Sequence, residues 1–364
     1  MKKSLLIVLP NIGNGGAERV VTNLLNNIDR NKFIVSLVLL REEGDYIDDL
    51  KEDIKIYNIN ASRSRYSIIP LIKIINSMKP DIVFSTLRGV SMILSLIRPF
   101  LVEDIKYVFR EENTPSISIN DNKFPILTTI YYKTLYKKAD IIICQSKYMQ
   151  SDLINNFSFP KNKTIQIYNP VDFNNINEQL KGNEIIPLNK NKFNILLVGR
   201  LTKQKGLENL LFSVKKNIHQ LEVNNAHIHI IGDGELSSEL NSLSNQLRLN
   251  DFVTFHGRQS NPYIWMKESD LYLLTSRYEG LPNSLLEAAA CKCNIITNHH
   301  PGGTKEIMKI LNIENNIVKD INFENFWFNL SSQFVNYKEF FDVFNLTSII
   351  KEYEKVFESL FKEK

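Results

Sequence analysis

Cysteine is scarce in this chain of 364 residues, and no long apolar run occurs in it. The three cysteines, Cys144, Cys291 and Cys293, form no disulfide framework, which indicates a reducing compartment. No cluster of further cysteines or histidines accompanies Cys291 and Cys293, so we expect no metal site there. No stretch reaches the roughly 20 apolar residues of a transmembrane helix. We therefore expect a cytoplasmic protein.

The N-terminal segment resembles a signal peptide only superficially. Lys2 and Lys3 precede an apolar run over residues 4–10. This run is too short, and it leads into a glycine-rich loop without a small-residue cleavage site. We interpret it as the first buried strand.

Charge of either sign is not in strong excess, since the net charge is +4 and the pI is about 8.7. Zinc-finger spacing and an arginine-rich arm are both lacking, so we expect no nucleic-acid partner. The mildly basic balance fits anionic substrates or an anionic membrane face. A Gly-x-Gly-x-x-Gly motif is also lacking, because Gly13-Asn14-Gly15-Gly16 has different spacing, and this argues against a dinucleotide-dependent dehydrogenase.

Strand and helix patterns alternate along the chain, and its length favours two domains. The alternation predicts α/β domains, each with a doubly wound parallel sheet. We place the first domain at 1–172, a linker at 173–192 and the second domain at 193–345, with a C-terminal helix over 346–364. The strands expected in the first domain are 5–9, 34–40, 54–57, 81–84, 106–110, 141–144 and 164–168.

The most informative segment is 278–290, which opens a helix after Gly280-Leu281-Pro282. Pro282 suits the first turn of a helix, and the residues from Ser284 to Ala290 are strong helix formers. The first free amides, from Asn283 and Ser284, share the positive end of the helix dipole. This helix start therefore predicts a diphosphate site.

Two carboxylates flank that helix start. Glu287 lies one turn inside the helix, where it can accept hydrogen bonds from vicinal hydroxyls such as those of ribose. Glu279 precedes the helix and can face a second polyol, the transferred sugar. A dipole-favoured surface residue and an ordinary turn are the alternative interpretations of this pair.

A buried strand over 193–198 ends upstream in Gly199-Arg200, with Lys203 and Lys205 following. Ligands of open α/β sheets bind beyond the carboxyl ends of such strands. Arg200 offers a planar fork for two phosphate oxygens, and Lys205 offers a mobile point charge. Lys203 is interpreted as an ordinary surface cation.

A second strand, 228–231, leads into Gly232-Asp233-Gly234-Glu235. The glycines permit close backbone approach, either to a nucleotide base or to the neighbouring loop.

The ordered set of motifs resembles the retaining family-four glycosyltransferases of GT-B fold. The set comprises Gly-Arg-Leu with a following Lys-Gly, Gly-Asp-Gly-Glu, Glu-x7-Glu around Gly-Leu-Pro, and Pro301-Gly302-Gly303 before Glu306. The segment Asn14-Gly15-Gly16-Ala17-Glu18 resembles the glycine loop of that family's first domain. The resemblance implies two Rossmann-like domains facing a central cleft, with the C-terminal helix crossing back to the first domain.

The resemblance also implies transfer of a hexose or N-acetylhexosamine from a nucleotide sugar, with UDP as the expected nucleotide. The expected acceptor is a saccharide or a polyprenyl-diphosphate-linked saccharide in capsule, O-antigen or lipooligosaccharide assembly. No metal and no cofactor besides the donor is expected. The catalytic positions are then Arg200, Lys205 and Glu279. The donor-binding positions are Gly15, Gly16, Gly199, Gly232, Asp233, Gly234, Glu235, Gly280, Leu281, Pro282, Asn283, Ser284 and Glu287.

Charge builds on the diphosphate as it leaves, so cations and amide dipoles aimed at it are the main catalytic need. No residue has the features of a covalent nucleophile, which favours front-face attack assisted by the departing phosphate. Glu279 then anchors sugar hydroxyls. Gly15 and Gly16 would bring backbone amides to the acceptor side when the cleft closes.

The chain departs from its family at one position. Many relatives carry a histidine after the strand that ends here at Arg110, whereas this chain continues Glu111-Glu112-Asn113. Glu112 or Asn113 takes that position, or each is a strand-end cap. All six histidines lie in the second half, and His299 and His300 are expected to line the donor loop.

Basic and aromatic residues of the first domain favour a peripheral contact with an anionic membrane, although scattered solvated side chains explain them almost as well. The sugar and linkage stay open, and so do two alternative functions. These are a nucleotide-sugar epimerase and a non-catalytic partner of another transferase. The basic and aromatic residues are Arg63, Arg65, Tyr66, Lys73, Lys79, Arg88, Arg98, Lys106, Tyr131, Tyr132, Lys133, Tyr136, Lys137 and Lys138.

Overall fold

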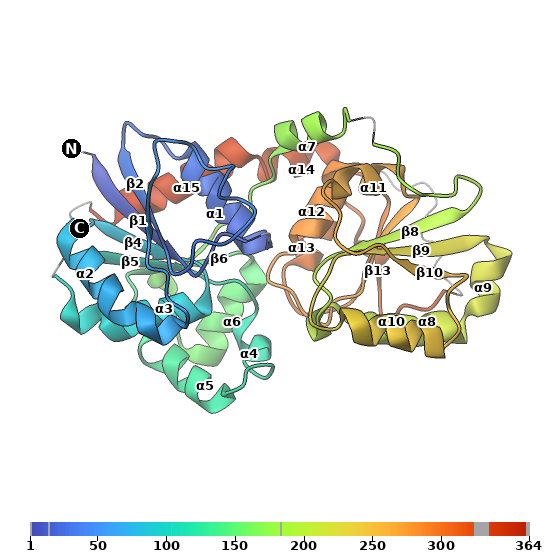
Figure 1. Cartoon of the computed structure of the whole chain (residues 1–364), viewed down its shortest axis with the longest axis horizontal. Helices are drawn as coiled ribbons and strands as arrows, with labels where there is room; N and C mark the ends of the chain where they lie inside the picture. The colour runs from blue at the N-terminus through green and yellow to red at the C-terminus, as the bar shows by residue number, and fades with distance from the viewer. Residues whose placement is uncertain (1, 14, 103, 183, 324–334, 362–364) are drawn as a thin grey trace. The chain divides into compact units, whose positions relative to one another are not determined.

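The computed structural model describes residues 2–13, 15–102, 104–182, 184–323 and 335–361 (Figure 1). The chain divides into two compact units. The first unit comprises 1–170 and 344–364, and the second comprises 171–343. None of the helices in the described ranges is long and apolar enough to cross a membrane.

The first unit is built on a seven-stranded parallel sheet with the order β3-β2-β1-β4-β5-β6-β7. Most of its strands are buried runs of Val, Ile and Leu, as expected of a parallel sheet covered on both faces. The strands are β1 (Lys3–Leu9), β2 (Phe33–Leu39), β3 (Lys55–Asn58), β4 (Ile82–Ser85), β5 (Lys106–Arg110), β6 (Ile141–Cys144) and β7 (Thr164–Gln166).

Helices cover both faces of this sheet and enclose two separate apolar clusters. One cluster joins the sheet to α1 (Gly16–Asn27) and α15 (Leu346–Ser359). The other joins it to four further helices, namely α2 (Ile68–Met78), α3 (Arg88–Ile97), α5 (Pro125–Lys133) and α6 (Lys147–Phe157). A short helix, α4 (Pro115–Ser118), precedes α5.

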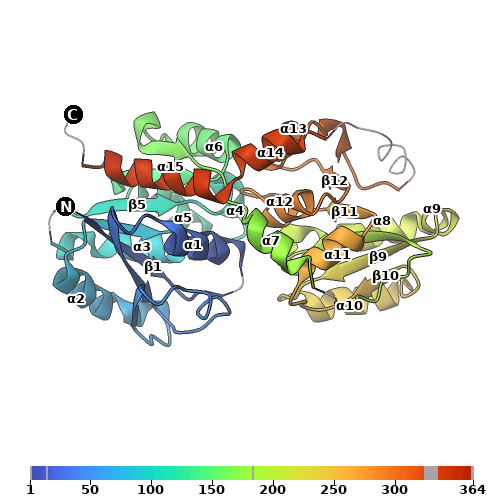
Figure 2. The same cartoon turned by 90° about the horizontal axis from the view of Figure 1, so that it is seen from above.

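The C-terminal helix α15 belongs to the first unit, as the resemblance implied. Its Phe357 ring lies 5.9 Å from the rings of both Phe33 and Phe84, in edge-to-face geometry. Tyr353 makes a further edge contact with Phe84 at 6.2 Å. Figure 2 shows α15 running alongside this unit. The apolar residues spaced three and four apart predicted a helix here, and the family resemblance implied its return to the first domain.

The second unit is built on a six-stranded parallel sheet with the order β10-β9-β8-β11-β12-β13. Its strands are β8 (Phe193–Val198), β9 (Ala226–Ile231), β10 (Val253–Phe255), β11 (Leu271–Leu274), β12 (Ile295–Asn298) and β13 (Ile317–Val318). Its helices are α7 (Phe173–Gln179), α8 (Leu207–Lys216), α9 (Ile218–Val223), α10 (Ser237–Gln246), α11 (Pro262–Glu268), α12 (Asn283–Ala290), α13 (Thr304–Ile310) and α14 (Tyr337–Val343).

The segment 173–192, expected to be a linker, contains α7. This helix lies against α11 and α12, and its Phe173 ring contacts those of Phe340 and Phe341 in α14. The structure therefore groups α7 with the second unit.

Both sheets are parallel and doubly wound, which confirms the predicted fold class. In each sheet the strand order reverses direction at one place, between β1 and β4 in the first unit and between β8 and β11 in the second. Ligands of open α/β sheets bind at such a reversal, beyond the carboxyl ends of the strands. These two places are therefore where candidate sites are expected.

A buried histidine cluster lies in the second unit. His229 on β9 shares a hydrogen bond with His256 (Nδ1 to Nε2, 2.9 Å), and its Nε2 lies 3.0 Å from the Asn194 side-chain oxygen. The rings of His229 and His256 also contact Trp265. Burial, together with the neighbouring His227 and His256, lowers the pKa of His229 to about 3. His229 is therefore neutral in the folded protein.

We expect this cluster to make the second unit sensitive to acid. The unfolded chain protonates His229 near pH 6.5 and the folded chain only near pH 3, so stability is lost as the pH falls between these values. Wild type is expected to lose free energy of unfolding relative to His229→Gln as the pH falls from 6.5 to 4.5, by up to about 1.4 kcal/mol per pH unit. Urea unfolding across this range measures it. Exposed His219→Gln is the control, and a gap that does not change with pH contradicts the expectation.

Candidate functional site in the second unit

A pocket lies at the strand-order reversal of the second unit. Its walls come from the carboxyl ends of β8, β9 and β11 and from the loops that follow β8 and β11. This is the place that parallel-sheet architecture favours for a ligand. The lining residues are Leu197, Val198, Gly199, Leu201, Lys205, Leu207, Ile230, Ile231, Tyr272, Leu273, Leu274, Thr275 and Ser276.

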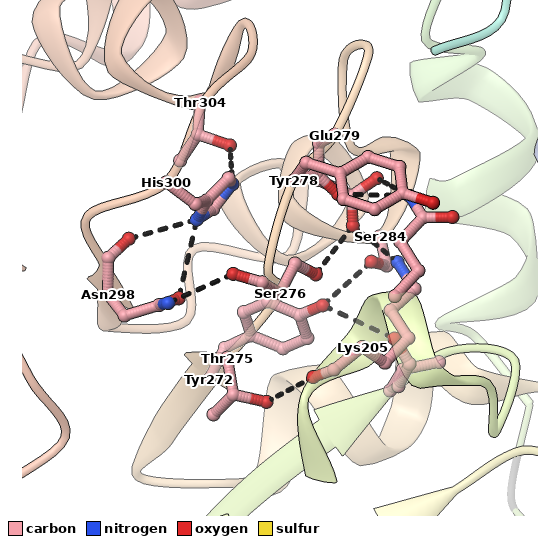
Figure 3. A network of polar contacts seen from close by, with 12 residues as sticks. Lys205, Tyr272, Thr275, Ser276, Tyr278, Glu279, Ser284, Asn298, His300 and Thr304 are labelled. Atoms are coloured by element: carbon pink, nitrogen blue, oxygen red, sulfur yellow. Dashed lines mark hydrogen bonds and ion pairs between the residues drawn. The ribbon is translucent and has the colours of Figure 1, made fainter. Parts of the chain in front are cut away.

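An ion pair between Lys205 and Glu279 dominates the polar side of this region (Figure 3). The Lys205 Nζ lies 2.6 Å from the Glu279 Oε1, and both side chains are largely buried. Ser276 donates its hydroxyl to the same carboxylate oxygen at 2.6 Å. Gln204 donates its side-chain amide to Oε2 at 3.2 Å. Glu279 is thus held by three neighbours, and it holds Lys205 in turn.

Burial opposes the ionisation of Glu279, but the neighbouring polar and charged groups favour it more strongly. The Lys205 ammonium and the Ser276 hydroxyl lower the pKa of Glu279 below its usual range, with a smaller contribution from His300. Glu279 is therefore a carboxylate at neutral pH, which suits it to accept hydrogen bonds rather than to act as a general acid. Its role as a sugar-hydroxyl anchor remains a prediction.

Backbone contacts fix the loop that carries Lys205 to the loop after β11. Thr275 donates its hydroxyl to the Lys205 carbonyl at 2.8 Å, and the Arg277 amide donates to the Gln204 carbonyl at 2.7 Å. The Lys205 side chain passes over Gly199, where an added Cβ would lie 3.1 Å from its Cε. Gly199 therefore leaves space for the lysine, a purpose that its sequence position alone did not indicate.

A third loop, after β12, supports the segment that carries Glu279. The Glu279 amide donates to the Pro301 carbonyl at 3.0 Å, and the Gly303 amide donates to the Gly280 carbonyl at 2.8 Å. Gly302 has φ +129°, and an added Cβ would lie 2.1 Å from the Glu279 carbonyl oxygen. Only glycine fits there.

His300 lies in this third loop and is buried. Its Nε2 shares a hydrogen bond with the Thr304 hydroxyl at 2.7 Å, and its Nδ1 lies 3.0 Å from the Asn298 carbonyl oxygen. Asn298 in turn donates its side-chain amide to the Ser276 carbonyl at 2.9 Å. Figure 3 shows His300 beside the Glu279 segment. The expectation that His300 lines the donor loop therefore agrees with its position in the fold.

Helix α12 begins where the sequence predicted, with Pro282 as its N-cap. Ser284 in its first turn accepts a hydrogen bond from the Tyr272 hydroxyl at 2.7 Å, and Tyr272 lines the pocket. Glu287 is partly buried and lies three residues after Ser284, on the same side of α12. The structure thus gathers Lys205, Glu279, Ser284 and Glu287 around one strand end.

Other predicted donor residues have structural partners or point outward. An added Cβ on Gly232 would lie 1.9 Å from the Gly199 carbonyl oxygen, and one on Gly234 would lie 2.5 Å from the Leu201 carbonyl oxygen. Two interpretations were left open for these glycines, and the structure shows the close approach to a neighbouring loop. The Asp233 carboxylate caps its own turn through the Gly234 amide (2.7 Å) and the Ser237 hydroxyl.

Arg200 and Glu235 are exposed. Within the described residues, no polar contact joins the Arg200 side chain to the Lys205–Glu279 pair. Its role on the diphosphate remains a prediction.

Candidate site in the first unit

The strand-order reversal of the first unit carries acidic groups. Gly15 is the N-cap of α1, and Gly16 is its first residue. Glu112 accepts a hydrogen bond from the Arg88 amide at 3.1 Å, and so caps α3. Burial, together with the adjacent Glu111, raises the pKa of Glu112 to about 7, and Glu18 on α1 contributes to the rise. Glu112 thus caps a helix, and the pKa of its carboxyl group lies near neutral pH.

Glu111 is a core residue. It accepts a hydrogen bond from the Tyr132 hydroxyl at 2.8 Å and lies 3.9 Å from the Arg88 guanidinium. Arg88 also donates to the Tyr132 hydroxyl at 3.0 Å. Burial raises the pKa of Glu111. Glu112 is therefore the less enclosed of the two carboxyl groups after β5.

The expected basic and aromatic membrane face is wrong for three of its four tyrosines, since only Tyr66 is exposed. Tyr131, Tyr132 and Tyr136 are buried, and their rings pack against one another. Arg88 belongs to the carboxylate network described above. The physical reason is that tyrosines at positions 131, 132 and 136 share the inner face of α5 and the following turn.

Similarity to known proteins

Two family models match the chain. The model described as Glycosyltransferase Family 4 matches residues 14–175, and that described as Glycosyl transferases group 1 matches residues 180–321. A relative from Campylobacter jejuni is 32% identical over 317 residues, which cover 84% of this chain and 83% of the relative. The chain belongs to the group 1, family 4 glycosyltransferases. It is accordingly an enzyme that transfers sugar from a nucleotide sugar in glycan biosynthesis.

The Campylobacter relative is named N-acetylgalactosamine-N,N'-diacetylbacillosaminyl-diphospho-undecaprenol 4-alpha-N-acetylgalactosaminyltransferase. An Escherichia coli O-antigen biosynthesis glycosyltransferase, WbnH, is 27% identical over 281 residues, which cover 75% of each chain. Among solved structures, HepE of Anabaena in complex with UDP and glucose has a TM-score of 0.74 at 15% identity, covering 98% of this chain and 100% of its own. That likeness confirms the GT-B fold.

Gln204, Ser276 and Asn298 were missed as site residues. Ser276 lies just after β11, three positions before Glu279, a spacing that could have indicated its hydroxyl as a partner. Gln204 lies in the turn after β8 and Asn298 ends β12, and no sequence spacing relates them to Glu279.

Gly302→Ala is expected to destabilise the second unit by about 2 kcal/mol or more, because alanine is strained at φ +129° and its methyl group would collide with the Glu279 carbonyl. Donor binding is expected to weaken with it, since the Glu279 segment sets the place of Lys205. Thermal unfolding and donor titration measure the two effects. Gly182→Ala, whose added Cβ meets ordinary contacts, is the control. Equal stability of the two variants contradicts the expectation.

Proposed function

We propose that the chain moves a hexose or N-acetylhexosamine from a UDP-linked donor to a saccharide carried on polyprenyl diphosphate, with retention of anomeric configuration and without a metal. The observation that carries the proposal is the Lys205 ammonium fixed beside the first turn of α12 at the strand-order reversal. The family supplies the reaction class, and the arrangement of charges supports the rest.

The leaving diphosphate needs positive charge in place before the bond breaks. Lys205 uses one of its three N–H groups on Glu279, so the others can bind phosphate oxygens. The Asn283 and Ser284 amides and the α12 dipole add fixed positive potential. Arg200 is proposed to reach the diphosphate from the rim. Because Glu279 already holds Lys205, little reorganisation is needed when the donor binds.

Glu287 is proposed to accept hydrogen bonds from the ribose, since it lies one helix turn beyond the proposed phosphate site. In front-face transfer the acceptor hydroxyl attacks the anomeric carbon on the side that the diphosphate leaves. The departing phosphate oxygen takes the hydroxyl proton, so no protein general base is needed. Glu279 is then proposed to bind hydroxyls of the transferred sugar through the remaining capacity of its carboxylate.

The acceptor is proposed to bind the first unit at the ends of β1, β4 and β5, near Gly15, Gly16 and Glu112. The name of the Campylobacter relative supports a carrier of the polyprenyl-diphosphate class, because that protein is named for an undecaprenyl-diphosphate acceptor. We place the reaction at the cytoplasmic face of the membrane, where a lipid-linked acceptor would meet a nucleotide sugar.

Lys205→Met is expected to lower kcat/KM for transfer at least 100-fold, because a fixed cation aimed at the leaving group is lost. Lys203→Met is the matched control, since Lys203 is exposed in the same turn and should leave the rate within about twofold. Radiolabelled transfer to a synthetic polyprenyl-diphosphate saccharide, with UDP-, GDP- and ADP-sugars compared, measures both. Equal losses in the two variants would contradict the assignment of Lys205.

Glu279→Gln tests the carboxylate itself. It retains the shape of the side chain but replaces one acceptor oxygen with an amide donor and removes the charge that holds Lys205. We therefore expect weaker donor binding and a slower transfer rate. Glu239→Gln, at an exposed acidic residue of the same unit outside the named site, is the control. Full rate and affinity in Glu279→Gln would remove Glu279 from the mechanism.

Two further measurements, together with the transfer assay, separate the alternative functions. A thermal-shift panel of nucleotide sugars detects donor binding, because a ligand of the folded state raises its apparent stability. Product analysis without acceptor would reveal an epimerase, which changes the sugar alone. Donor binding without transfer to any acceptor favours a non-catalytic partner.

A further inference from the structure

Helix α5 of the first unit presents apolar side chains outward. Phe124, Ile126, Leu127 and Ile130 are 59%, 76%, 59% and 52% exposed. They lie within seven consecutive residues on one short helix and its N-cap. Single exposed apolar residues are ordinary, but a contiguous group of this kind marks an interaction surface. In Figure 1, α5 lies at the lower end of the first unit.

The opposite side of α5 explains why its apolar residues face outward. Thr128, Tyr131 and Tyr132 are buried, and the two tyrosines pack into the core of the unit. The tyrosines therefore hold the helix to the core of the unit. Its aliphatic residues take no part in that core, so burying them requires another surface.

The polar groups of the helix need little water. Thr128, Thr129 and Thr134 donate their hydroxyls back to the carbonyls of Phe124, Pro125 and Ile130, at 2.9, 2.9 and 2.7 Å. Hydroxyls satisfied inside the helix can enter an apolar environment at low cost. The outer face of α5 is thus suited to the upper part of a lipid bilayer.

Lysines border this apolar face at both ends. Lys123 precedes the helix, with its ammonium 5.8 Å from the Phe124 ring, and Lys133 ends it. Lys137 and Lys138 follow in the next turn, while the nearby Asp140 is paired with Arg98 at 3.5 Å. The exposed Asp121 offsets one of these four lysines, so the local charge is still positive. Lysines beside apolar side chains can keep their ammonium groups among anionic head groups.

We propose that the outer face of α5, with Phe124, Ile126, Leu127 and Ile130 bordered by Lys123 and Lys133, docks the protein on an anionic lipid bilayer. Apolar insertion and charge attraction supply the two signals that stable peripheral binding needs. A second copy of the chain fits this face less well, because a twofold contact would set lysines against lysines. The proposal specifies where the membrane meets the enzyme proposed above, and its test measures binding rather than transfer.

Flotation of the full chain with vesicles tests the proposal. Vesicles of phosphatidylcholine with about a third phosphatidylglycerol are compared with pure phosphatidylcholine. Wild type should bind the anionic vesicles, less so at high salt. The triple variant Ile126→Asn, Leu127→Asn, Ile130→Asn should lose at least tenfold in partition coefficient. Its folding should be unaffected, because the replaced side chains are exposed, and circular dichroism checks this.

The matched control is Ile185→Asn, Phe212→Asn, Val223→Asn, which replaces three exposed apolar residues of the second unit and should bind as wild type. Lys123→Gln with Lys133→Gln should reduce binding several-fold and flatten its salt dependence. Equal flotation of wild type and the α5 triple variant overturns the proposal. So does a wild-type dimer in sedimentation that this variant dissociates.

The outcome is separable from that of the transfer reaction. On a water-soluble acceptor the α5 triple variant should transfer sugar at the wild-type rate, because none of its changes lies at the candidate site. A chain that transfers to no acceptor but still floats would refute the proposed function and leave the docking surface intact.

Discussion

The candidate site depends on the ion pair between Lys205 and Glu279. A buried ion pair is rarely an efficient source of stability, because desolvation of both groups offsets their attraction. Its value lies in position, since it fixes a flexible lysine where an anion can share it. Ser276 and Gln204 complete the hydrogen bonds of the carboxylate, so the pair is held without an uncompensated charge. Three loops converge to make this arrangement.

The two units use the same architecture with different charged groups. In the second unit, the strand-order reversal carries a lysine and a helix N-terminus, which suits a diphosphate. In the first, Glu18, Glu111 and Glu112 gather at the equivalent place, with Arg88 as their main cation. A surface that carries carboxyl groups, one of them with a pKa near neutral pH, suits hydroxyl groups better than phosphates. The contrast agrees with a donor side and an acceptor side in one enzyme.

Much of the fold could be predicted because parallel strands are continuous apolar runs and helices have their own period. Residues 106–110 and 141–144 became β5 and β6 with the expected bounds. Helix α12 begins at Asn283 with Pro282 as its N-cap, close to the expected start, because the preferences of proline and of the following residues are local. The contact of Lys205 with Glu279 could not be predicted, since it depends on how two loops 74 residues apart lie in space. Tyr131 and Tyr132 were assigned to the surface because polarity alone does not show which helix face is inside.

Several glycines allow the loops of this site to approach one another closely. For Gly232 and Gly234 the sequence left open approach to a nucleotide base or to a neighbouring loop, and Gly199 was expected only as a donor-binding position. Each of the three lies against a neighbouring loop or side chain of the same unit. A Cβ at Gly232 would push away the turn that follows β8, and one at Gly302 would push away Glu279. These glycines thus set the spacing between loops, and that spacing sets the distance between lysine and carboxylate. Ligand recognition by the ion pair therefore rests on residues that need not touch the ligand at all.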